Sequence, residues 1–524
     1  MRALVCCSSA HTWHSVASCF MAVYVCRYSD TFNALLTSAL NQCAGLHEQP
    51  STVNPMCERK LHVTCIGAGY VGGPTMAVIA KRCPDVNVVI CDISDSVIKA
   101  WQSPELPVKE AGLQDLVTQV RGKNLFFTTD LVRPVLEADI IFVCVDTPPK
   151  SCGDKAGYAS DTCNFERAIR GIASATKAAG GAGTGRKTVV VKSTVPVGTW
   201  RIVRAIFNAN GLEHSIVSNP EFLAEGTAVA DLLDPSRVLV GSECSKAASQ
   251  VADLYARWVP RDRIILTDTT SSEMSKLVAN ALLAQRISSI NCASILCERV
   301  GADVGHVARA VGADPRIGKA FLRASVGFGG SCFRKDVLNL AHVCRSASLP
   351  ELGDYWESIV QMNEFQKERF VCTMSTHMFG SLRGKRVAVL GFAFKKNTAD
   401  ARETAAAYVV RRLLQERATV VVYDPMVPES TVRAEVGGDE GASPLLTVAA
   451  TAAEAANAAH AVAILTEWDE FRYPSEDASC AVDYPSLYRA MTKPAFIFDG
   501  RRVTNAEMLR KIGFVAYSVG SAAT

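Results

Sequence analysis

The sequence lacks the features that mark several broad classes of protein. No apolar run approaches the roughly 20 residues that a membrane-spanning helix needs. Lys and Arg number 55 against 52 Asp and Glu, so no excess of charge indicates a nucleic-acid or membrane surface. The 19 cysteines include no Cys-x-x-Cys pair, which argues against a zinc or dithiol redox site. We therefore expect no nucleic acid, no membrane and no metal among its ligands.

The composition otherwise indicates an ordinary globular protein of the cytoplasm. Hydrophobic residues make up 48% of the chain and charged residues 20%. A secreted disulfide framework would be unusual in a chain of 524 residues with a large core, so we expect most cysteines to be reduced core residues. This length predicts two or three domains.

The first 55 residues differ from the rest. They hold five of the cysteines, few acids and an apolar stretch, Cys19 to Cys26, that loosely resembles a short signal-peptide core. The basic lead-in is weak and no small-x-small cleavage site follows it. We expect residues 1–55 to be an unstructured extension or an upstream stretch that is not translated, with Met56 as the natural start.

The remaining sequence has a repeated α/β pattern. Short apolar, β-branched segments alternate with helix-length segments and predict strands at 61–66, 87–92, 138–145, 187–191, 215–218, 237–240 and 263–266. A second set of strands is predicted at 386–390, 419–424, 461–465 and 495–499, with a helix in the alanine-rich stretch 447–461. Residues 271–311 lack proline and predict a long helix interrupted near Gly301.

These patterns predict an α/β fold with two Rossmann-like, doubly wound domains joined by a long central helical segment. We expect the first α/β domain at 56–268, the central segment at 269–380 and the second α/β domain at 381–524. The central helix also offers a surface for self-association.

A glycine-rich turn follows the first predicted strand: Gly67-Ala-Gly69-Tyr70-Val71-Gly72. Its glycines permit a tight turn and close approach of the backbone to a pyrophosphate at a helix N-terminus. Asp92 ends the second strand, twenty residues after Gly72, where its carboxylate can accept bonds from a ribose hydroxyl. This spacing of the strand, the glycine turn and the acid predicts NAD as the cofactor. NADP is disfavoured because Asp92 would repel its 2′-phosphate.

A second signal surrounds Cys332 in the run Gly327-Phe-Gly-Gly-Ser-Cys332-Phe-Arg-Lys335-Asp336. A nearby lysine is expected to lower the pKa of the thiol and supply a nucleophilic thiolate. Taken alone, a buried structural cysteine in a glycine turn is the plainer interpretation.

Neighbouring polar residues favour the nucleophile. Lys276 and Asn280 lie four apart on the predicted long helix, and their apolar neighbours favour an inward direction over a solvated face. The run from Asn219 to Gly226 follows a strand at the carboxyl edge of the sheet, where active sites gather. Its acids are also compatible with a simple helix N-cap.

From about Met56 to Gly520 the chain resembles the UDP-glucose/GDP-mannose dehydrogenase family, and within it the eukaryotic UDP-glucose 6-dehydrogenases, close to the animal type. The shared runs are 65–75, 122–127, 192–197, 218–227, 283–291, 324–333, 390–396 and 493–502. The resemblance implies NAD-dependent, four-electron oxidation of UDP-glucose to UDP-glucuronate in the cytoplasm. The route passes through a thiohemiacetal and a thioester on Cys332. An arginine matching Arg316 usually comes from a neighbouring subunit, which implies a homo-oligomer built from dimers, possibly a hexamer.

The resemblance also implies a role for each matching position. The catalytic residues would be Cys332, Lys276, Asn280, Asp336, Glu221 and Thr194. NAD would be bound by Gly67, Gly69, Tyr70, Val71, Gly72, Asp92, Thr147, Ser193, Glu225, Lys335 and Arg402. UDP-glucose would be bound by Glu221, Phe222, Leu223, Ala224, Glu225, Lys276, Asn280, Arg316, Phe321, Arg323, Phe328, Gly329, Phe394, Lys395 and one of Arg501 and Arg502.

Three positions depart from the family pattern. Asp146 stands where relatives usually carry Asn beside the cofactor, Val97 replaces an Arg near the adenosine ribose, and Arg323 replaces a common Lys. An added carboxylate at Asp146 would weaken NAD binding unless a nearby cation neutralises it.

Two other functions are compatible with parts of the pattern. A dehydrogenase of another nucleotide sugar, such as GDP-mannose or a UDP-N-acetylhexosamine, would keep Cys332 and Lys276. A non-catalytic regulator that binds NAD or a nucleotide sugar would keep the glycine turn but usually loses the nucleophile or the base, and here the full set is present.

Overall fold

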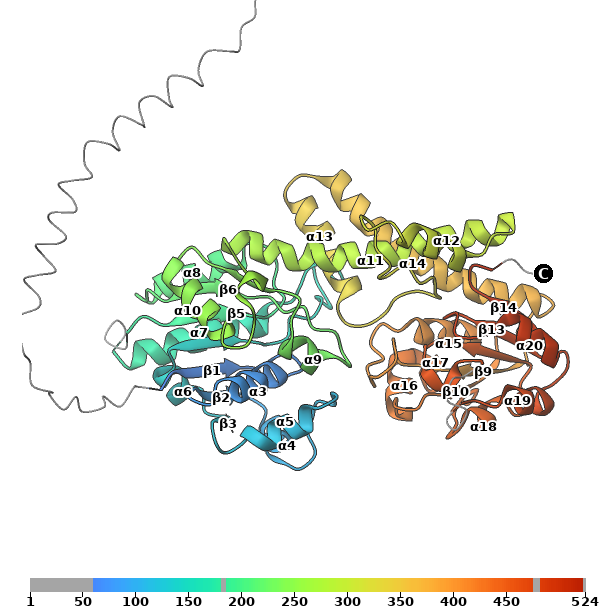
Figure 1. Cartoon of the computed structure of the whole chain (residues 1–524), viewed down its shortest axis with the longest axis horizontal. Coiled ribbons are helices and arrows are strands. Elements are labelled where there is room, and N and C mark those ends of the chain that lie inside the picture. The colour runs from blue at the N-terminus through green and yellow to red at the C-terminus, as the bar shows by residue number, and fades with distance from the viewer. Residues whose placement is uncertain (1–59, 181–184, 475–480, 522–524) are drawn as a thin grey trace, which may run out of the picture. The chain divides into compact units, whose positions relative to one another are not determined.

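The computed structural model describes residues 60–180, 185–474 and 481–521 (Figure 1). The expectation for residues 1–55 lies outside the described residues. Lys60 to the C-terminus forms one compact unit.

The first sheet of the described chain has eight strands in the order β3-β2-β1-β4-β5-β6-β7-β8. The strands are β1 (His62–Ile66), β2 (Asn87–Cys91), β3 (Leu125–Thr128), β4 (Ile140–Val143), β5 (Thr188–Val191), β6 (Ser215–Ser218), β7 (Val238–Gly241) and β8 (Ile264–Thr267). Among these strands only β6 and β7 pair antiparallel, at Ser218 and Gly241. Its helices are α3 (Gly72–Arg82), α4 (Asp95–Gln102), α5 (Leu113–Val120), α6 (Val132–Glu137), α7 (Cys163–Ala178), α8 (Thr199–Ala209), α9 (Ala228–Leu233) and α10 (Ser245–Tyr255).

The second sheet of the described chain has six parallel strands in the order β11-β10-β9-β12-β13-β14. The strands are β9 (Arg386–Leu390), β10 (Thr419–Tyr423), β11 (Leu446–Val448), β12 (Ala461–Ile464), β13 (Phe496–Asp499) and β14 (Val515–Ser518). Its helices are α15 (Ala405–Gln415), α16 (Glu429–Val436), α17 (Gly438–Gly441), α18 (Ala452–Ala456), α19 (Tyr484–Ala490) and α20 (Ala506–Ile512).

Four helices lie between the two sheets in the sequence. They are α11 (Thr269–Val300), α12 (Val304–Gly312), α13 (Phe333–Ser346) and α14 (Pro350–His377). Asp268 caps α11 by accepting a bond from the Ser271 amide at 2.8 Å. The helix ends at Gly301, whose φ of 82° is a left-handed conformation that glycine adopts without strain. Helix α11 packs against α13 and α14 and so holds the segment around Cys332.

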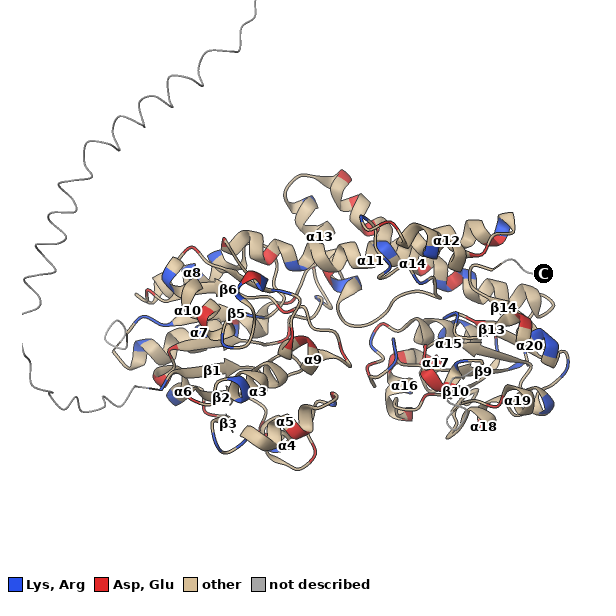
Figure 2. Ribbon diagram, viewed as in Figure 1, with Lys and Arg blue, Asp and Glu red and all other residues tan. Residues whose placement is uncertain are grey.

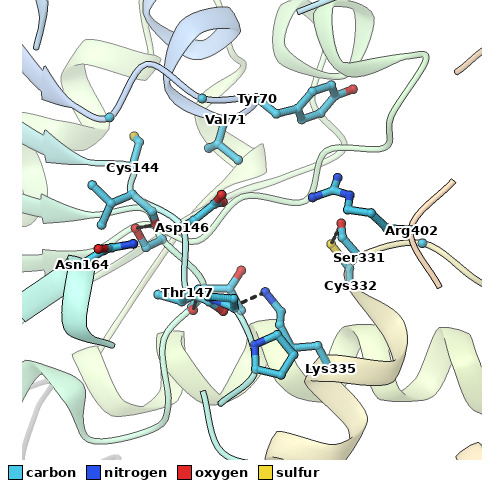
Figure 3. A pocket seen from close by; sticks show the side chains of 18 of the residues that line it. Tyr70, Val71, Cys144, Asp146, Thr147, Asn164, Ser331, Cys332, Lys335 and Arg402 are labelled. Atoms are coloured by element: carbon cyan, nitrogen blue, oxygen red, sulfur yellow. Dashed lines mark hydrogen bonds between the residues drawn. The ribbon is translucent and has the colours of Figure 1, made fainter. Parts of the chain in front are cut away.

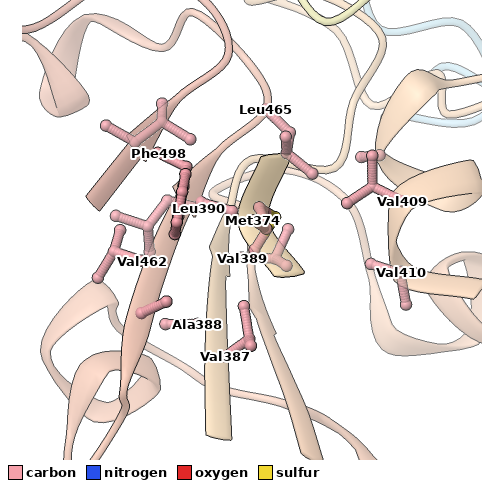
Figure 4. Packing of buried hydrophobic residues seen from close by; sticks show 14 of the residues in the cluster. Met374, Val387, Ala388, Val389, Leu390, Val409, Val410, Val462, Leu465 and Phe498 are labelled. Carbon is pink, nitrogen blue, oxygen red and sulfur yellow. The ribbon is translucent and has the colours of Figure 1, made fainter. Parts of the chain in front are cut away.

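The burial of the strands in the cores explains why their sequences are continuously apolar. In the second sheet Val387 to Leu390 of β9 are fully buried and pack with Val409 and Val410 of α15 and Met374 of α14 (Figure 4). Strands of a parallel sheet that are covered on both faces become continuous apolar runs rather than alternating ones. Charged residues of both signs are spread over the elements of both sheets (Figure 2).

The predicted fold class is confirmed, with corrections of detail. Three strands were not predicted, β3, β11 and β14, and all three lie at sheet edges, where pairing on one side leaves a weaker sequence pattern. The helix predicted in the stretch 447–461 is present but short, because the stretch begins within β11 and α18 spans only Ala452–Ala456. Among the described helices, none has the length and apolar character needed to cross a bilayer.

Candidate active site

A cavity of about 1050 Å³ is lined by residues from both α/β parts of the chain. The glycine turn and Asp92 line it from the first sheet, Cys332 and Lys335 from the start of α13, and Arg402 from the loop before α15. The carboxyl ends of parallel strands are where doubly wound sheets bind their ligands. Much of the predicted cofactor site therefore shares one space with Cys332.

Two glycines of the turn have no room for a side chain. A Cβ on Gly67 would lie 2.6 Å from the Cys144 carbonyl oxygen, and one on Gly72 would lie 2.1 Å from the Gly67 carbonyl oxygen. Asp92 fixes this turn, because its Oδ2 accepts a bond from the Ala68 amide at 2.8 Å. A bare backbone cradle beside a carboxylate fits the pyrophosphate and ribose of NAD.

The opposite wall is formed by hydrogen-bonded loops (Figure 3). Thr147 Oγ1 donates to the Thr194 carbonyl oxygen at 2.5 Å, and Ser193 Oγ donates to the Val145 carbonyl oxygen at 2.7 Å. Lys335 Nζ lies 3.5 Å from the Thr147 carbonyl oxygen, which ties the start of α13 to this wall. The structure thus brings four of the predicted cofactor and water-holding residues together.

Cys332 occupies the N-cap position of α13, with its Sγ 3.6 Å from Ser331 Oγ (Figure 3). Burial raises the pKa of the Cys332 thiol above its usual range, and the Asp336 carboxylate raises it further. Lys276 and Lys335 act in the other direction but do not outweigh burial. The lysines thus lower the pKa of the thiol, as predicted, but the net pKa stays above its usual range because burial and Asp336 raise it more.

Buried polar groups surround the thiol. Lys276 is 4% exposed, so its side chain points inward from α11, and its Nζ lies 2.7 Å from Glu221 Oε1. Burial alone would lower the pKa of Lys276, but Glu221 and Asp336 together raise it, so the ammonium form persists. Asn280 Nδ2 donates to Asp336 Oδ2 at 2.6 Å, while burial raises the pKa of that carboxyl.

The loop before Cys332 packs on the second α/β part. A Cβ on Gly329 would lie 2.6 Å from the Glu403 carbonyl oxygen, and one on Gly330 would lie 2.9 Å from the Phe394 ring. Arg501 Nη2 donates to the Phe394 carbonyl oxygen at 2.6 Å. Phe394 and Arg501 therefore lie beside the glycine loop that carries the nucleophile.

The two candidate arginines have different surroundings. Arg502 Nη2 donates to both carboxylate oxygens of Asp303, at 3.0 and 2.8 Å, and its Nη1 donates to the Val519 carbonyl oxygen. Asp303 is the N-cap of α12, so Arg502 ties that helix to the end of β14. Arg501 Nε lies 3.2 Å from Glu467 Oε2, so both arginines pair with a carboxylate of the chain.

Several predicted substrate residues do not line the 1050 Å³ cavity. Arg316 has an exposed side chain that pairs with Asp314 at 2.7 Å. Phe222 lies under two cations, Arg237 at 3.8 Å and Lys276 at 5.5 Å from its ring centre. The others outside the lining are Ala224, Lys276, Asn280, Phe321, Arg323, Phe328, Gly329, Phe394, Lys395, Arg501 and Arg502, with Gly72 and Asp336 among the predicted cofactor and catalytic residues.

Sequence reasoning missed two acids at this site. Asp400 accepts from Arg402 Nη2 at 2.7 Å, and the same guanidinium reaches Glu225 Oε1 at 3.1 Å. Burial, together with the charge of Asp400, raises the pKa of Glu225 to about 8. Glu110 accepts the Tyr70 hydroxyl and the Gly226 amide, and so ties the cofactor turn to the Glu225 segment. No sequence pattern marks either acid, because Glu110 binds Gly226 and Asp400 acts on Glu225, and both pairs are far apart along the chain.

The departure at Asp146 also has a visible counterpart. Asp146 and Arg402 line the same cavity (Figure 3), and the Asp146 charge adds to that of Asp400 in raising the pKa of Arg402. Arg402 is thus a nearby cation of the kind that would neutralise Asp146.

A backbone cradle for NAD, a cysteine beside a buried lysine and a second nucleotide-sized sheet define a two-domain NAD-dependent dehydrogenase. The chain belongs to the UDP-glucose/GDP-mannose dehydrogenase family. Its NAD binding domain model matches residues 61–259, its central domain model 270–365 and its UDP binding domain model 388–506.

Curated relatives and solved structures agree with this assignment. The chain is 51% identical to UDP-glucose 6-dehydrogenase 1 of Oryza sativa subsp. japonica and 49% identical to UDP-glucose 6-dehydrogenase 1 of Arabidopsis thaliana. Each alignment covers 87% of this chain and 96% of the relative. A UDP-glucose dehydrogenase from the archaeon Pyrobaculum islandicum superimposes with a TM-score of 0.75 at 30% identity, covering 90% of this chain and all of that one. These relatives include plant enzymes at half identity, so they do not support the expected closeness to the animal type.

Proposed function

We propose that this protein oxidises UDP-glucose to UDP-glucuronate with NAD, using Cys332 as a covalent nucleophile. The observation that carries the mechanism is the cluster of buried Lys276, Asn280, Asp336 and Glu221 around the Cys332 thiol. The identity of about half to curated UDP-glucose 6-dehydrogenases over 87% of the chain supports the substrate. NAD, when bound at the glycine turn, accepts a hydride in each of the two oxidations.

The cysteine begins the covalent route. Asp336 lies one helical turn after Cys332, and its raised pKa suits it to take the thiol proton as Sγ bonds to C6 of the sugar aldehyde. Oxygen at C6 then carries negative charge. Lys276 Nζ and Asn280 Nδ2 are the donors that stabilise it.

Hydrolysis ends the cycle. After the second oxidation C6 is a thioester of Cys332, which water cleaves to the carboxylic acid and the free thiol. Glu221 and Asp336 are the carboxylates that hold the water and accept its proton, with Thr194 beside them in the cavity wall. Because the intermediate stays covalently attached, no free aldehyde leaves between the steps.

The proposal includes a homo-oligomer in the cytoplasm. Arg316 is exposed and outside the cavity, which is compatible with a contact to a sugar nucleotide on a neighbouring copy. Leu282, Leu296 and Val300 of α11 are exposed apolar residues that a second copy would cover. The cysteines of the described residues are free thiols, which supports a reducing compartment.

The deciding experiment is product stoichiometry. Purified protein with NAD and UDP-glucose should release two NADH for each sugar nucleotide consumed, and light scattering after gel filtration should give an oligomer. GDP-mannose and UDP-N-acetylglucosamine serve as competing substrates. Turnover with one of these and none with UDP-glucose would move the assignment to another nucleotide sugar. NAD binding with no turnover on any of them would favour a regulator.

A further inference from the structure

A second cavity of about 190 Å³ lies behind the Glu221 segment, lined by residues of the first α/β part. Its lining runs from the exposed residues Asp234 and Ser236 to the buried residues Lys192 and Asn219. This side cavity therefore leads from the protein surface into the interior at the carboxyl ends of β5 and β6.

The two cavities share a wall. Lys192, Glu221 and Leu223 line both the side cavity and the 1050 Å³ cavity. Glu221 links this shared wall to the reacting groups, because its Oε1 lies 2.7 Å from Lys276 Nζ. The charges of Asp336 and Cys332 both act on the pKa of Lys276. Glu221 belongs to the proposed reacting cluster, so a water molecule bound to it in the side cavity would contact that cluster.

The side cavity is polar enough to hold water. Lys192 Nζ and the Tyr255 hydroxyl donate to Asn219 Oδ1, at 3.1 and 2.8 Å. Arg237 stacks on Phe222, and among the described residues no carboxylate pairs with its guanidinium. A buried water needs about 10–15 Å³ and two to four polar partners, so this space has room for several waters.

The hydrolytic step of the proposed reaction needs a supply of water. A dinucleotide and a nucleotide sugar in the main cavity exclude bulk water from the covalent intermediate on that side. We infer that the side cavity is the water and proton route of the hydrolytic half-reaction, with Glu221 as the group that passes water to the thioester. This inference rests on the proposed function.

The step balances without any oxidant. The water oxygen bonds to C6 and the C6–S bond breaks, with its electron pair remaining on the Cys332 sulfur. One proton of the water goes through Glu221 or Asp336 to that sulfur. The other stays on the new carboxylic acid, which ionises to the solvent.

The test obstructs the mouth of the side cavity and leaves the reacting groups unchanged. In Ser236→Trp a large ring replaces an exposed residue at the mouth. Ser236→Ala keeps the mouth open, and Ser249→Trp places the same ring on the exposed face of α10, outside the side cavity lining. The readouts are the NADH burst, the steady-state rate, and the acyl adduct on Cys332 measured by mass spectrometry after acid quench.

The expected result is a selective loss of hydrolysis. Ser236→Trp should keep a burst of two NADH per site, reach a steady state roughly tenfold slower than the wild type, and accumulate the Cys332 adduct. Both control variants should match the wild type. Unchanged turnover in Ser236→Trp, or a slower burst without adduct, would overturn the inference while the proposed function stands. A wild type that makes no NADH from UDP-glucose would overturn both.

Discussion

The Nζ atom of Lys276 lies 2.7 Å from Oε1 of Glu221 and 2.7 Å from the main-chain oxygen of the same residue. Both side chains are buried, so the pair is shielded from solvent. It joins the N-terminal part of α11 to the loop after β6 and fixes an ammonium beside the cysteine. The same contact is thus structural and, in the proposed mechanism, catalytic.

Breaking this pair should separate the two roles. Lys276→Ala leaves the Glu221 carboxylate buried without its cationic partner, which should lower the free energy of unfolding by about 3–5 kcal/mol. Adding Glu221→Gln removes the buried charge and should restore more than half of that loss, while turnover stays abolished. Urea unfolding and NADH release measure the two effects. A double variant as unstable as the single one would contradict the structural role.

The raised pKa of Cys332 predicts how the thiol reacts. In the protein without ligands, alkylation of Cys332 by iodoacetamide should become fast only above the usual pH range of a cysteine. Asp336→Asn removes a nearby negative charge and should move this midpoint to lower pH. Lys276→Met removes a positive charge and should move it higher.

Peptide mass spectrometry is needed for this measurement, because other exposed cysteines such as Cys152 and Cys292 also react. A wild-type midpoint below pH 7 would show that the lysines outweigh burial after all.

Glu225 should make stability depend on pH. Its pKa is raised from 4.5 to about 8, so the folded protein holds this proton more tightly than the unfolded chain does. Stability from this group is therefore present at low pH and is lost as pH rises through this interval. Glu225→Gln cannot ionise, so it should gain on the wild type with rising pH, by on the order of a few kcal/mol at pH 9. Melting curves from pH 5 to 9 that run parallel would contradict this.

Asp92 should determine cofactor affinity and choice. Asp92→Asn keeps an acceptor for the Ala68 amide but removes the charge, so we expect NAD to bind roughly tenfold more weakly, since a bond to a charged group contributes about 1.5–3 kcal/mol. The preference for NAD over NADP should shrink at the same time. Calorimetric titration with both cofactors measures this. Asp115→Asn on α5, an exposed position outside the cavity lining, serves as the control and should bind like the wild type.

Arg501 and Arg502 should respond differently to the same change. Arg501→Ala should raise KM for UDP-glucose about tenfold, because a guanidinium beside Phe394 would be lost from the diphosphate. Arg502→Ala should leave KM nearly unchanged and lower the free energy of unfolding by about 1–3 kcal/mol, since Asp303 loses its partner. Steady-state kinetics and urea unfolding on both variants check this. The reverse pattern would assign the ligand contact to Arg502.

Local rules explain what could be predicted. Steric and hydrogen-bonding demands within about thirty residues of sequence fix the first strand, the turn from Gly67 to Gly72 and Asp92. This pattern can therefore be recognised from the sequence alone. The long α11 is likewise marked by its composition and by Gly301 at its end. The edge strands were missed because a strand paired on one side is short and partly exposed, as in β3 and β11.

By itself the sequence determined the two α/β parts, the central helix and the cofactor cradle, because each depends on neighbours along the chain. The resemblance to the family marked Cys332 as the candidate nucleophile. The tertiary structure alone decided the state of that nucleophile. Burial against Asp336 outweighs the lysine charge next to it, and burial depends on how distant segments pack. The same holds for the pairing of Arg402 with Glu225 and Asp400, and for the role of Arg502 at α12. Electrostatic energies in a protein depend on the distances between charges and on their dielectric surroundings, and neither can be obtained from the amino-acid sequence alone.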